Sequence, residues 1–267
     1  MNRRAFLRRS SLLTGGALAG AGVLAGAAGS AAAEEYRVHT DVAMSGLAVG
    51  PARPAGLRGT SLTYRVDTDV PMVALTFDDG PSERFTPRVL DILERARVVA
   101  TFFMIGSHAS ALPELARRVA QRHEIGNHTA THPDLSLARA AEATAQLAHA
   151  AEQIRIATGR APTVFRPPYG RFSGASAMVA AGMQYPIVLW DLKFDVRSTA
   201  GSNVDRLAAA AGPGSIILGH DGGTLDNDVV AQALPGLIDR LRARGLRFAT
   251  VSELLTARPG TAVSSSG

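Results

Sequence analysis

The sequence predicts an α/β fold in which seven strands alternate with helices and close into a barrel. Short apolar runs of strand length recur between residues 73 and 250, helical patterns separate them, and chemically reactive residues follow several of the runs. Repeated β-α alternation implies a parallel sheet, and seven units favour a barrel over an open sheet. In such a barrel the loops after the strands share one rim, where the chemistry takes place.

The expected strands are Val73–Phe77, Ala100–Met104, Glu124–Asn127, Thr163–Phe165, Ile187–Trp190, Ser215–Leu218 and Phe248–Thr250. The expected helices are Pro87–Arg95, Pro113–Gln121, Leu137–Thr158, Gly174–Ala181, Asn203–Ala210 and Val229–Arg244. The longest of these helices is rich in alanine and places Leu147, Ala151 and Ile154 on one apolar face.

The first 33 residues have the features of an export signal. Paired arginines at positions 3 and 4 precede Phe-Leu, residues 12–28 are uncharged, and three alanines at positions 31–33 offer a cleavage site. This pattern predicts a twin-arginine signal, the twin-arginine export machinery as a partner, and a secreted or envelope-associated protein. The alternatives are an uncleaved anchor and an ordinary export signal. The apolar run is short and glycine-rich compared with the ~20 residues of a spanning helix.

The charge and composition exclude some partners. The net charge is +5, and residues 1–33 carry four arginines and no acid, so the remainder is near +1. No basic cluster with interleaved aromatic residues remains, and we expect no nucleic-acid partner. The chain has no cysteine, so a core alone must stabilise it. We expect a monomer.

The two ends of the chain differ from its middle. Residues 34–70 contain several glycines and prolines with weak periodicity, which predicts an irregular N-terminal arm. Residues 259–267 end in Ser-Ser-Ser-Gly and predict a disordered tail. One folded domain is therefore expected over residues 71–258.

Two adjacent carboxylates, Asp78 and Asp79, end the first expected strand and precede Gly80-Pro81. Asp-Asp-Gly-Pro is also a good turn sequence, so the pair alone is a weak signal. Because adjacent side chains of a strand point to opposite sides, one carboxylate could bind a metal while its neighbour faces a water molecule.

Two histidines, His128 and His132, follow the third expected strand and are four residues apart. In a helical or turn-like segment this spacing lets both imidazoles bind one ion. With one aspartate they form a three-ligand set with an open position, and the second aspartate remains as a base, which is the minimum for hydrolysis by an activated water. We expect structural roles for the histidines without such partners: His39, His108, His123 and His149.

Two further segments bring reactive groups to the expected rim. Arg166 begins a rigid Arg-Pro-Pro-Tyr-Gly turn, where it could orient Asp78 while the amide of Tyr169 or Gly170 points at a reacting oxygen. His220 follows the sixth expected strand and is a candidate proton donor at neutral pH. The alternatives are a plain proline turn and a polar loop residue.

Together these segments resemble the NodB-type polysaccharide deacetylases, carbohydrate esterase family four. The resemblance covers about residues 72–256 and follows the family's order of motifs. It is carried by Val73–Pro81, Ala100–Phe103, Glu124–His128, His132-Pro133, Phe165–Gly170 and Leu218–His220.

The resemblance implies a distorted (β/α)7 barrel and makes residues 71–258 a NodB-like catalytic domain. It implies that Asp78 is the catalytic base and that Asp79, His128 and His132 are the metal ligands. In the same way Arg166 would orient the base, and His220 would be the catalytic acid.

One segment departs from the family pattern. The family has an Asp-Trp pair after the fifth strand, whereas residues 190–196 read Trp-Asp-Leu-Lys-Phe-Asp-Val and are one residue short, with Val196 at the position of the Trp. Asp195 is the candidate support for His220, and Asp191 is the alternative. If Val196 leaves the acetyl pocket wider, Trp190 or Phe194 could restore its wall.

The expected activity is metal-dependent hydrolysis of acetyl groups from N-acetylated glycans such as peptidoglycan or chitin oligosaccharides, with Zn²⁺ or Co²⁺ bound and Tyr169 contributing to the oxyanion site. An esterase acting on acetylated xylan is an alternative, because amide and ester hydrolysis share a tetrahedral intermediate. A non-catalytic glycan-binding barrel that kept the metal site is a second alternative. The occupied base, metal and acid positions weigh against it.

Overall fold

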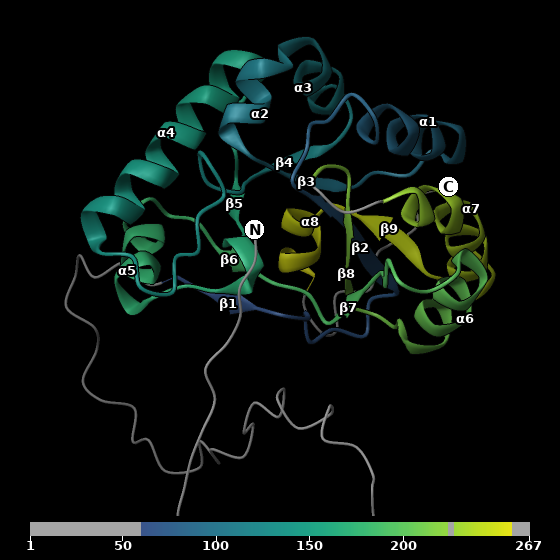
Figure 1. The fold of residues 1–267 in the computed structure, drawn as a ribbon. Helices are drawn as coiled ribbons and strands as arrows, with labels where there is room; N and C mark the ends of the chain where they lie inside the picture. Colours follow the sequence, from purple (N-terminus) through teal and green to yellow (C-terminus); the bar gives the residue numbers. More distant parts are fainter. Residues whose placement is uncertain (1–59, 224–226, 258–267) are drawn as a thin grey trace, which may run out of the picture. The chain divides into compact units, whose positions relative to one another are not determined.

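The computed structural model describes residues 60–223 and 227–257, which form a curved, fully parallel sheet surrounded by helices (Figure 1). The strand order is β1-β6-β5-β4-β3-β2-β8-β7, and β9 pairs with β2. The strands are β1 (Leu62–Thr63), β2 (Met72–Asp78), β3 (Thr101–Met104), β4 (Glu124–Asn127), β5 (Val164–Phe165), β6 (Ile187–Val188), β7 (Leu192–Lys193), β8 (Ile216–His220) and β9 (Arg247–Ala249). This arrangement confirms the predicted α/β barrel, and β1 and β7 are the edges at which it stays open.

The helices follow the strands in alternation and lie mostly outside the sheet (Figure 1). They are α1 (Thr86–Ala96), α2 (Gly106–Ala111), α3 (Pro113–Ala120), α4 (Ala140–Thr158), α5 (Gly174–Gly182), α6 (Ala200–Ala210), α7 (Asp228–Ala243) and α8 (Val251–Thr256), with a 3₁₀ turn, η1 (Pro168–Gly170). None of the described helices is long and apolar enough to cross a membrane.

All seven expected strands and all six expected helices are present, but the sequence did not predict β1, β7, α2 or α8. The two missed strands have only two residues each, and the two missed helices have six, too few for a periodic apolar pattern to emerge. The long helix starts at Ala140 and not at Leu137, which is 93% exposed in the preceding loop.

The alternation of side chains in β2 separates two layers of the core. Val73, Leu75 and Phe77 face outward and pack with residues of the surrounding helices. Ala74 faces inward and packs with inward-facing residues of β3, β5, β6 and β8. By the same alternation Thr76 and Asp78 point into the barrel. The apolar pattern of this strand thus determines that Asp78 is buried and faces inward.

Helix α8 fills one end of the barrel interior, and Figure 1 shows it inside the ring formed by the other helices. The buried Glu124, at the start of β4, accepts hydrogen bonds from the hydroxyls of Thr101 and Thr163, both at 2.7 Å. It also accepts bonds from the amide of Ser252, at 3.1 Å, and from the Ser252 hydroxyl. The carboxylate is fully satisfied despite its burial and holds α8 in place. The end of the barrel opposite to His128 is therefore closed.

An ion pair spans the open side of the barrel. Arg65, just after β1, donates to the Asp191 carboxylate at 3.0 Å and to the Ser215 hydroxyl at 2.9 Å. Asp191 also accepts from the amide of Ile216, at 2.7 Å. The end of the predicted irregular arm thus joins the sheet through β1 and this pair. Asp191, the alternative support for His220, is bound at the opposite end of β8.

Several predictions about the ends of the chain lie outside the described residues. These are the export signal of residues 1–33, the arm up to residue 59 and the tail of residues 259–267, and they remain predictions.

The buried His123 should make the folded protein less stable as the pH falls. His123 packs on the Phe102 ring at 5.2 Å between centroids, and its Nδ1 has no hydrogen-bond partner among the described residues. Burial, with a smaller contribution from the charge of Arg122, lowers the pKa of His123 to about 4. As the pH falls below ~6.5, His123 becomes protonated in the unfolded state but stays neutral in the folded state until pH ~4. The free energy of unfolding therefore falls by about 3 kcal/mol over that range.

We expect His123→Phe to lose less unfolding free energy than the wild type between pH 7 and pH 4, by up to about 3 kcal/mol. Urea unfolding at several pH values measures the two slopes. The matched control is His149→Phe, since His149 is exposed on α4 and its replacement should leave the wild-type slope unchanged. Parallel curves for His123→Phe and the wild type would show that His123 does not carry this dependence.

Candidate active site

The predicted catalytic residues meet at the rim where the strands end. Asp78 is paired with His220 in the register of β2 and β8, so the proposed base and acid end neighbouring strands. Asp79 follows β2, His128 follows β4 and Arg166 follows β5. Residues separated by more than 100 positions in the sequence are thereby brought to one face of the molecule.

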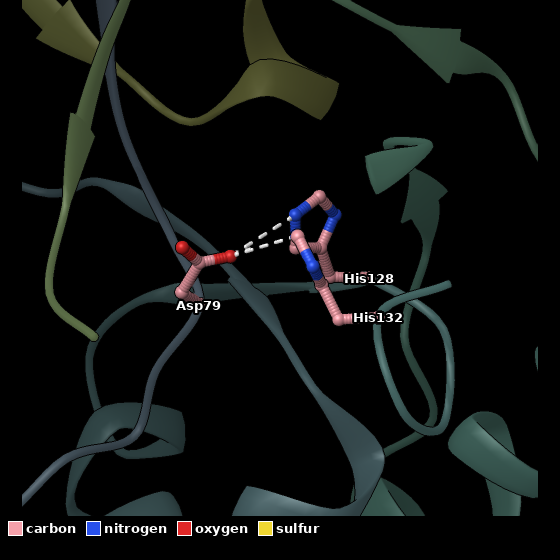
Figure 2. A group of neighbouring side chains, drawn as sticks. All are labelled: Asp79, His128 and His132. Atoms are coloured by element: carbon pink, nitrogen blue, oxygen red, sulfur yellow. Dashed lines mark ion pairs between the residues drawn. The ribbon is translucent and has the colours of Figure 1, made fainter. Parts of the chain in front are cut away.

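Asp79, His128 and His132 form a compact cluster in which one carboxylate oxygen faces both rings (Figure 2). Asp79 Oδ1 lies 3.4 Å from His128 Nε2 and 3.2 Å from His132 Nε2. The three ligand atoms lie within 4.8 Å of one another, the single such group among the described residues. Asp79 Oδ1 is buried and has no hydrogen-bond partner in the described part of the chain.

These residues fit a divalent metal. Tetrahedral ligands at roughly 2.0–2.1 Å from zinc lie about 3.3 Å apart, close to the two distances to Asp79 Oδ1. His128 Nδ1 is 2.7 Å from the Arg166 carbonyl, so it donates there and leaves Nε2 for an ion. A buried carboxylate oxygen without a donor is also a position that a cation would satisfy.

The segment that carries the two histidines is an irregular loop and not a helix. Thr129 and His132 have positive φ, 69° and 62°, and the His132 amide donates to the Thr129 hydroxyl at 3.0 Å. The Asn127 side chain accepts from the Thr129 amide at 2.9 Å. This tight turn, and not a helical repeat, brings the two rings to 5.0 Å between centroids.

The charges of the cluster favour an ionised Asp79. Burial alone would raise the pKa of Asp79, but the close approach and charge of the neighbouring His128 and His132 outweigh it and hold that pKa well below its usual value. For His128, burial lowers the pKa, while Asp78 and Asp79 raise it by more, so the net shift is upward. Asp79 is thus in the protonation state that a metal ligand needs.

A buried arginine, Arg166, is bonded to one oxygen of Asp78. Arg166 is fully buried, and its Nη1 donates to Asp78 Oδ1 at 2.7 Å and to the Thr76 hydroxyl at 2.9 Å. Its remaining nitrogens donate to the carbonyls of Val188 and Leu189, at 3.0 and 2.9 Å. Asp78 Oδ2 stays free of the arginine and lies 3.8 Å from His128 Nε2, facing the metal cluster.

The turn after Arg166 brings Tyr169 beside the cluster. Tyr169 has a positive φ of 59°, and its ring packs edge-on against His132 with 4.7 Å between centroids. The amide of Gly170 is used within the turn, where it donates to the Pro167 carbonyl at 3.0 Å. Of the two expected amide donors, Tyr169 is therefore the candidate that remains for the oxyanion site.

Asp195, the candidate support for His220, lies in the loop that follows β7. Lys193 pairs with Leu218, and the Phe194 amide donates to the Leu218 carbonyl at 2.9 Å, so the chain after β7 starts beside the end of β8. The Asp195 carboxylate, however, accepts a hydrogen bond from the Arg197 amide at 3.0 Å. A role for Asp195 in supporting His220 thus remains a prediction.

Two residues near the site were not predicted. His108 Nδ1 lies 2.8 Å from the Asp79 carbonyl, although we expected only a structural role for His108. Asp221 donates its amide to the Asp78 carbonyl at 3.1 Å and accepts from the Thr86 hydroxyl at 2.6 Å. Burial raises the pKa of Asp221 to about 7, and the charges of the two neighbouring aspartates add to that shift. Both residues lie within a few positions of the end of an expected strand, and this position could have indicated that they lie near the site.

The comparison with known proteins agrees with this site. A profile described as polysaccharide deacetylase matches residues 65–188. A chitooligosaccharide deacetylase of Sinorhizobium fredii is 42% identical over 194 residues, which cover 68% of this chain and 90% of that protein. The chain belongs to the polysaccharide deacetylase family. The predicted resemblance to carbohydrate esterase family four is thereby confirmed.

Other relatives of this polysaccharide deacetylase include proteins named as peptidoglycan deacetylases and one pseudoenzyme. A peptidoglycan-N-acetylglucosamine deacetylase of Bacillus cereus is 37% identical over 189 residues, covering 68% of this chain and 67% of that protein. Among solved structures, the Bc1960 peptidoglycan N-acetylglucosamine deacetylase has a TM-score of 0.71 and 32% identity, covering 74% of this chain and 94% of that one. The BA3943 pseudoenzyme of Bacillus anthracis, also of family four, has a TM-score of 0.68 and 26% identity, covering 75% and 71%.

Residues 190–196, the segment that departs from the family pattern, contain two aromatic residues that lie in different places, Trp190 and Phe194. Phe194 is buried in the outer core, where it and Phe77 flank Gly219, so it does not reach the site. Trp190 lies against the turn after Arg166, since a Cβ on Gly170 would come 3.1 Å from its ring. Of the two residues that could restore the pocket wall, only Trp190 is placed near the turn. Val196 is partly buried in the loop after β7.

We expect the wild-type enzyme to accept propionyl as well as acetyl esters, because Val196 covers less apolar area than a tryptophan would. Val196→Trp should restore discrimination against propionyl by roughly 1 kcal/mol, about fivefold in kcat/KM. The measurement is kcat/KM for matched acetyl and propionyl esters in both proteins. A wild type that is already strict for acetyl, and unchanged by Val196→Trp, would show that Val196 does not line the acyl pocket.

Proposed function

We propose that this polysaccharide deacetylase is an exported, metal-dependent enzyme that hydrolyses acetyl groups from N-acetylated glycans, with peptidoglycan or chitin oligosaccharides as the substrate class. The observation that carries the proposal is the meeting of the Asp79–His128–His132 cluster with an Asp78 carboxylate that a buried arginine holds by one oxygen only. The curated relatives that act on chitooligosaccharides and peptidoglycan support the substrate class.

Asp79, His128 and His132 would hold the ion, Zn²⁺ or Co²⁺. When bound, such an ion supplies Lewis-acid activation of water and of the acetyl carbonyl. The protein's own residues account for the proton transfers. Because Arg166 engages Asp78 Oδ1, the free Oδ2 faces the cluster and would take the proton of the attacking water.

The remaining steps fall to two other residues. The amide of Tyr169 would donate to the oxyanion of the tetrahedral intermediate, a contribution of the kind worth about 10²–10³-fold in rate. His220, at the end of the strand next to Asp78, would protonate the departing sugar amine as the C–N bond breaks. The products are acetate and the free amine.

Parallel assays of acetate release from peptidoglycan, chitin oligosaccharides and acetylxylan test the proposal. We expect release from one of the two N-acetylated substrates that stops after chelation and returns with Zn²⁺ or Co²⁺. Release from acetylxylan alone would favour the esterase alternative, for which amide cleavage would be absent. Glycan binding without any acetate release would favour a non-catalytic barrel, the class that the BA3943 structure exemplifies.

Export by the twin-arginine machinery is part of the same proposal and rests on residues 1–33. A folded protein passing through that route would carry its metal site already formed. Replacing Arg3 and Arg4 by lysine should retain the protein inside the cell, and fractionation of cells expressing both forms measures this. Unchanged export of the double variant would refute the twin-arginine assignment.

A further inference from the structure

Ile105 and the first residues of α2 contact both loops that carry the three ligand side chains. The amide of Ile105 donates to the Gly80 carbonyl at 3.0 Å, next to Asp79. The amides of Gly106 and Ser107 donate to the carbonyls of Thr129 and Ala130, at 2.9 and 3.0 Å, between the two histidines. Residues 105–108, which are Ile105 and the start of α2 and are called here the β3–α2 segment, therefore hold these loops without supplying a ligand.

Helix α4 contacts the loop between His128 and His132 through the backbone amides of that loop. Gln146 Oε1 accepts from the amides of Ala130 and Thr131, at 3.0 and 3.1 Å. The β3–α2 segment is itself pressed against α4, because a Cβ on Gly106 would come 2.7 Å from the Ala150 Cα. The backbone between His128 and His132 is thus fixed on both sides by the protein itself.

His108 is the one side chain of the β3–α2 segment that reaches a ligand residue. Its Nδ1 lies 2.8 Å from the carbonyl oxygen of Asp79, which can only accept, so Nδ1 carries the hydrogen. The same carbonyl also packs closely against the backbone of Gly222, since a Cβ on Gly222 would lie 2.1 Å from the Asp79 oxygen. Asp79 has a positive φ of 73°, a conformation that costs an aspartate energy and needs such external contacts.

We propose that His108 is a positioning residue that sets the affinity and geometry of the metal site by holding the backbone of Asp79. The φ and ψ of Asp79 determine whether its carboxylate points at His128 and His132, so a loosened carbonyl misdirects the ligand. His108 touches neither ion nor substrate. This inference rests on the proposed metal-dependent function, but its test measures binding and not turnover.

Two substitutions of His108 compare a side chain that keeps the hydrogen-bond donor with one that lacks it. In asparagine the Nδ2 donor is attached to Cγ, as Nδ1 is in histidine, so His108→Asn keeps a donor near the Asp79 carbonyl. His108→Leu has a similar shape at Cγ and no donor. Ser107→Ala is the control, because only the backbone amide of Ser107 contacts the loop. Loss of outer-shell partners typically weakens metal binding by about 10- to 100-fold.

The experiment titrates the apo forms of the full chain with Zn²⁺ against a chelator and records the visible spectrum of each Co²⁺-loaded protein. We expect His108→Leu to bind Zn²⁺ about 10- to 100-fold more weakly and to show an altered Co²⁺ spectrum. His108→Asn should recover most of the affinity, and Ser107→Ala should match the wild type.

Two results would overturn the proposal. Wild-type affinity and spectrum in His108→Leu would show that the contact is not used, and equal weakening in the Leu and Asn variants would show that the donor is not the cause. Should His108→Leu unfold, His108→Ala gives the same comparison with Asn. Intact Zn²⁺ binding in the wild type with the expected order among the variants, but without acetate release from any glycan, would contradict the proposed function and leave the role of His108 supported.

Discussion

Replacing Asp78 by asparagine is expected to abolish turnover, by about 10²–10⁴-fold in kcat, while one metal ion per chain stays bound. Asparagine keeps the oxygen that accepts from Arg166 and replaces Oδ2, the oxygen that faces the cluster, by an amide that cannot take a proton. Acetate release and metal content are measured on the same preparation. An active Asp78→Asn enzyme would place the base elsewhere, and loss of the metal would show that the roles of Asp78 and Asp79 are reversed.

The Asp78 experiment needs a stability control. Arg166 is fully buried, and Asp78 is the one carboxylate bonded to it among the described residues, so asparagine leaves a buried charge uncompensated. Breaking a buried pair from one side typically costs about 3–5 kcal/mol. Unfolding curves of the variant must therefore show a folded protein at the assay temperature. A folded, metal-loaded and inactive variant isolates the proton-transfer role.

Replacing His132 by alanine is expected to remove the metal, with an affinity loss of more than about 100-fold, the upper end of what outer-shell changes cause. His132 supplies one of three ligand atoms and lies 3.2 Å from the shared oxygen of Asp79. Metal analysis after dialysis against a weak chelator measures the loss, and activity should fall with it. Excess Zn²⁺ or Co²⁺ should restore part of both.

The matched control for His132→Ala is His149→Ala. His149 is exposed on α4, outside the ligand cluster, and its loss should change neither metal content nor activity. Stoichiometric metal in His132→Ala after the same dialysis would refute the ligand assignment. The loss of the ring contact with Tyr169 also predicts a change in KM, which can be read at saturating metal.

The apolar runs of the sequence were enough to predict the barrel and the rim. Val73–Phe77 is an apolar run interrupted by Thr76 and followed by an aspartate, and it predicted a buried strand with a carboxylate at its end. The order of the motifs then indicated which rim residues would meet. The pairing of Asp78 with His220, and of Arg166 with Asp78, agrees with that expectation because parallel strands bring their ends together.

The parts that the sequence did not predict depend on contacts without a local pattern. The His128–His132 loop owes its shape to Asn127, Gln146 and the amides of residues 106–107, and no periodic pattern marks such bonds. His108 was missed for the same reason. Asp195 was predicted as the candidate support for His220 with Asp191 as the alternative, and the bonds of Asp191 to Ile216 and Arg65 place the alternative at the other end of β8.

Trp190 is the only tryptophan in the chain, and it lies against Gly170 in the turn that carries Tyr169, with the Arg166 guanidinium 5.6 Å from its ring centre. All tryptophan fluorescence of the protein therefore originates beside the active site. An emission change on adding Zn²⁺ or a glycan would report events at that turn, without any label or engineered probe. The enzyme thus carries an intrinsic optical reporter for rapid-mixing experiments that resolve binding from hydrolysis.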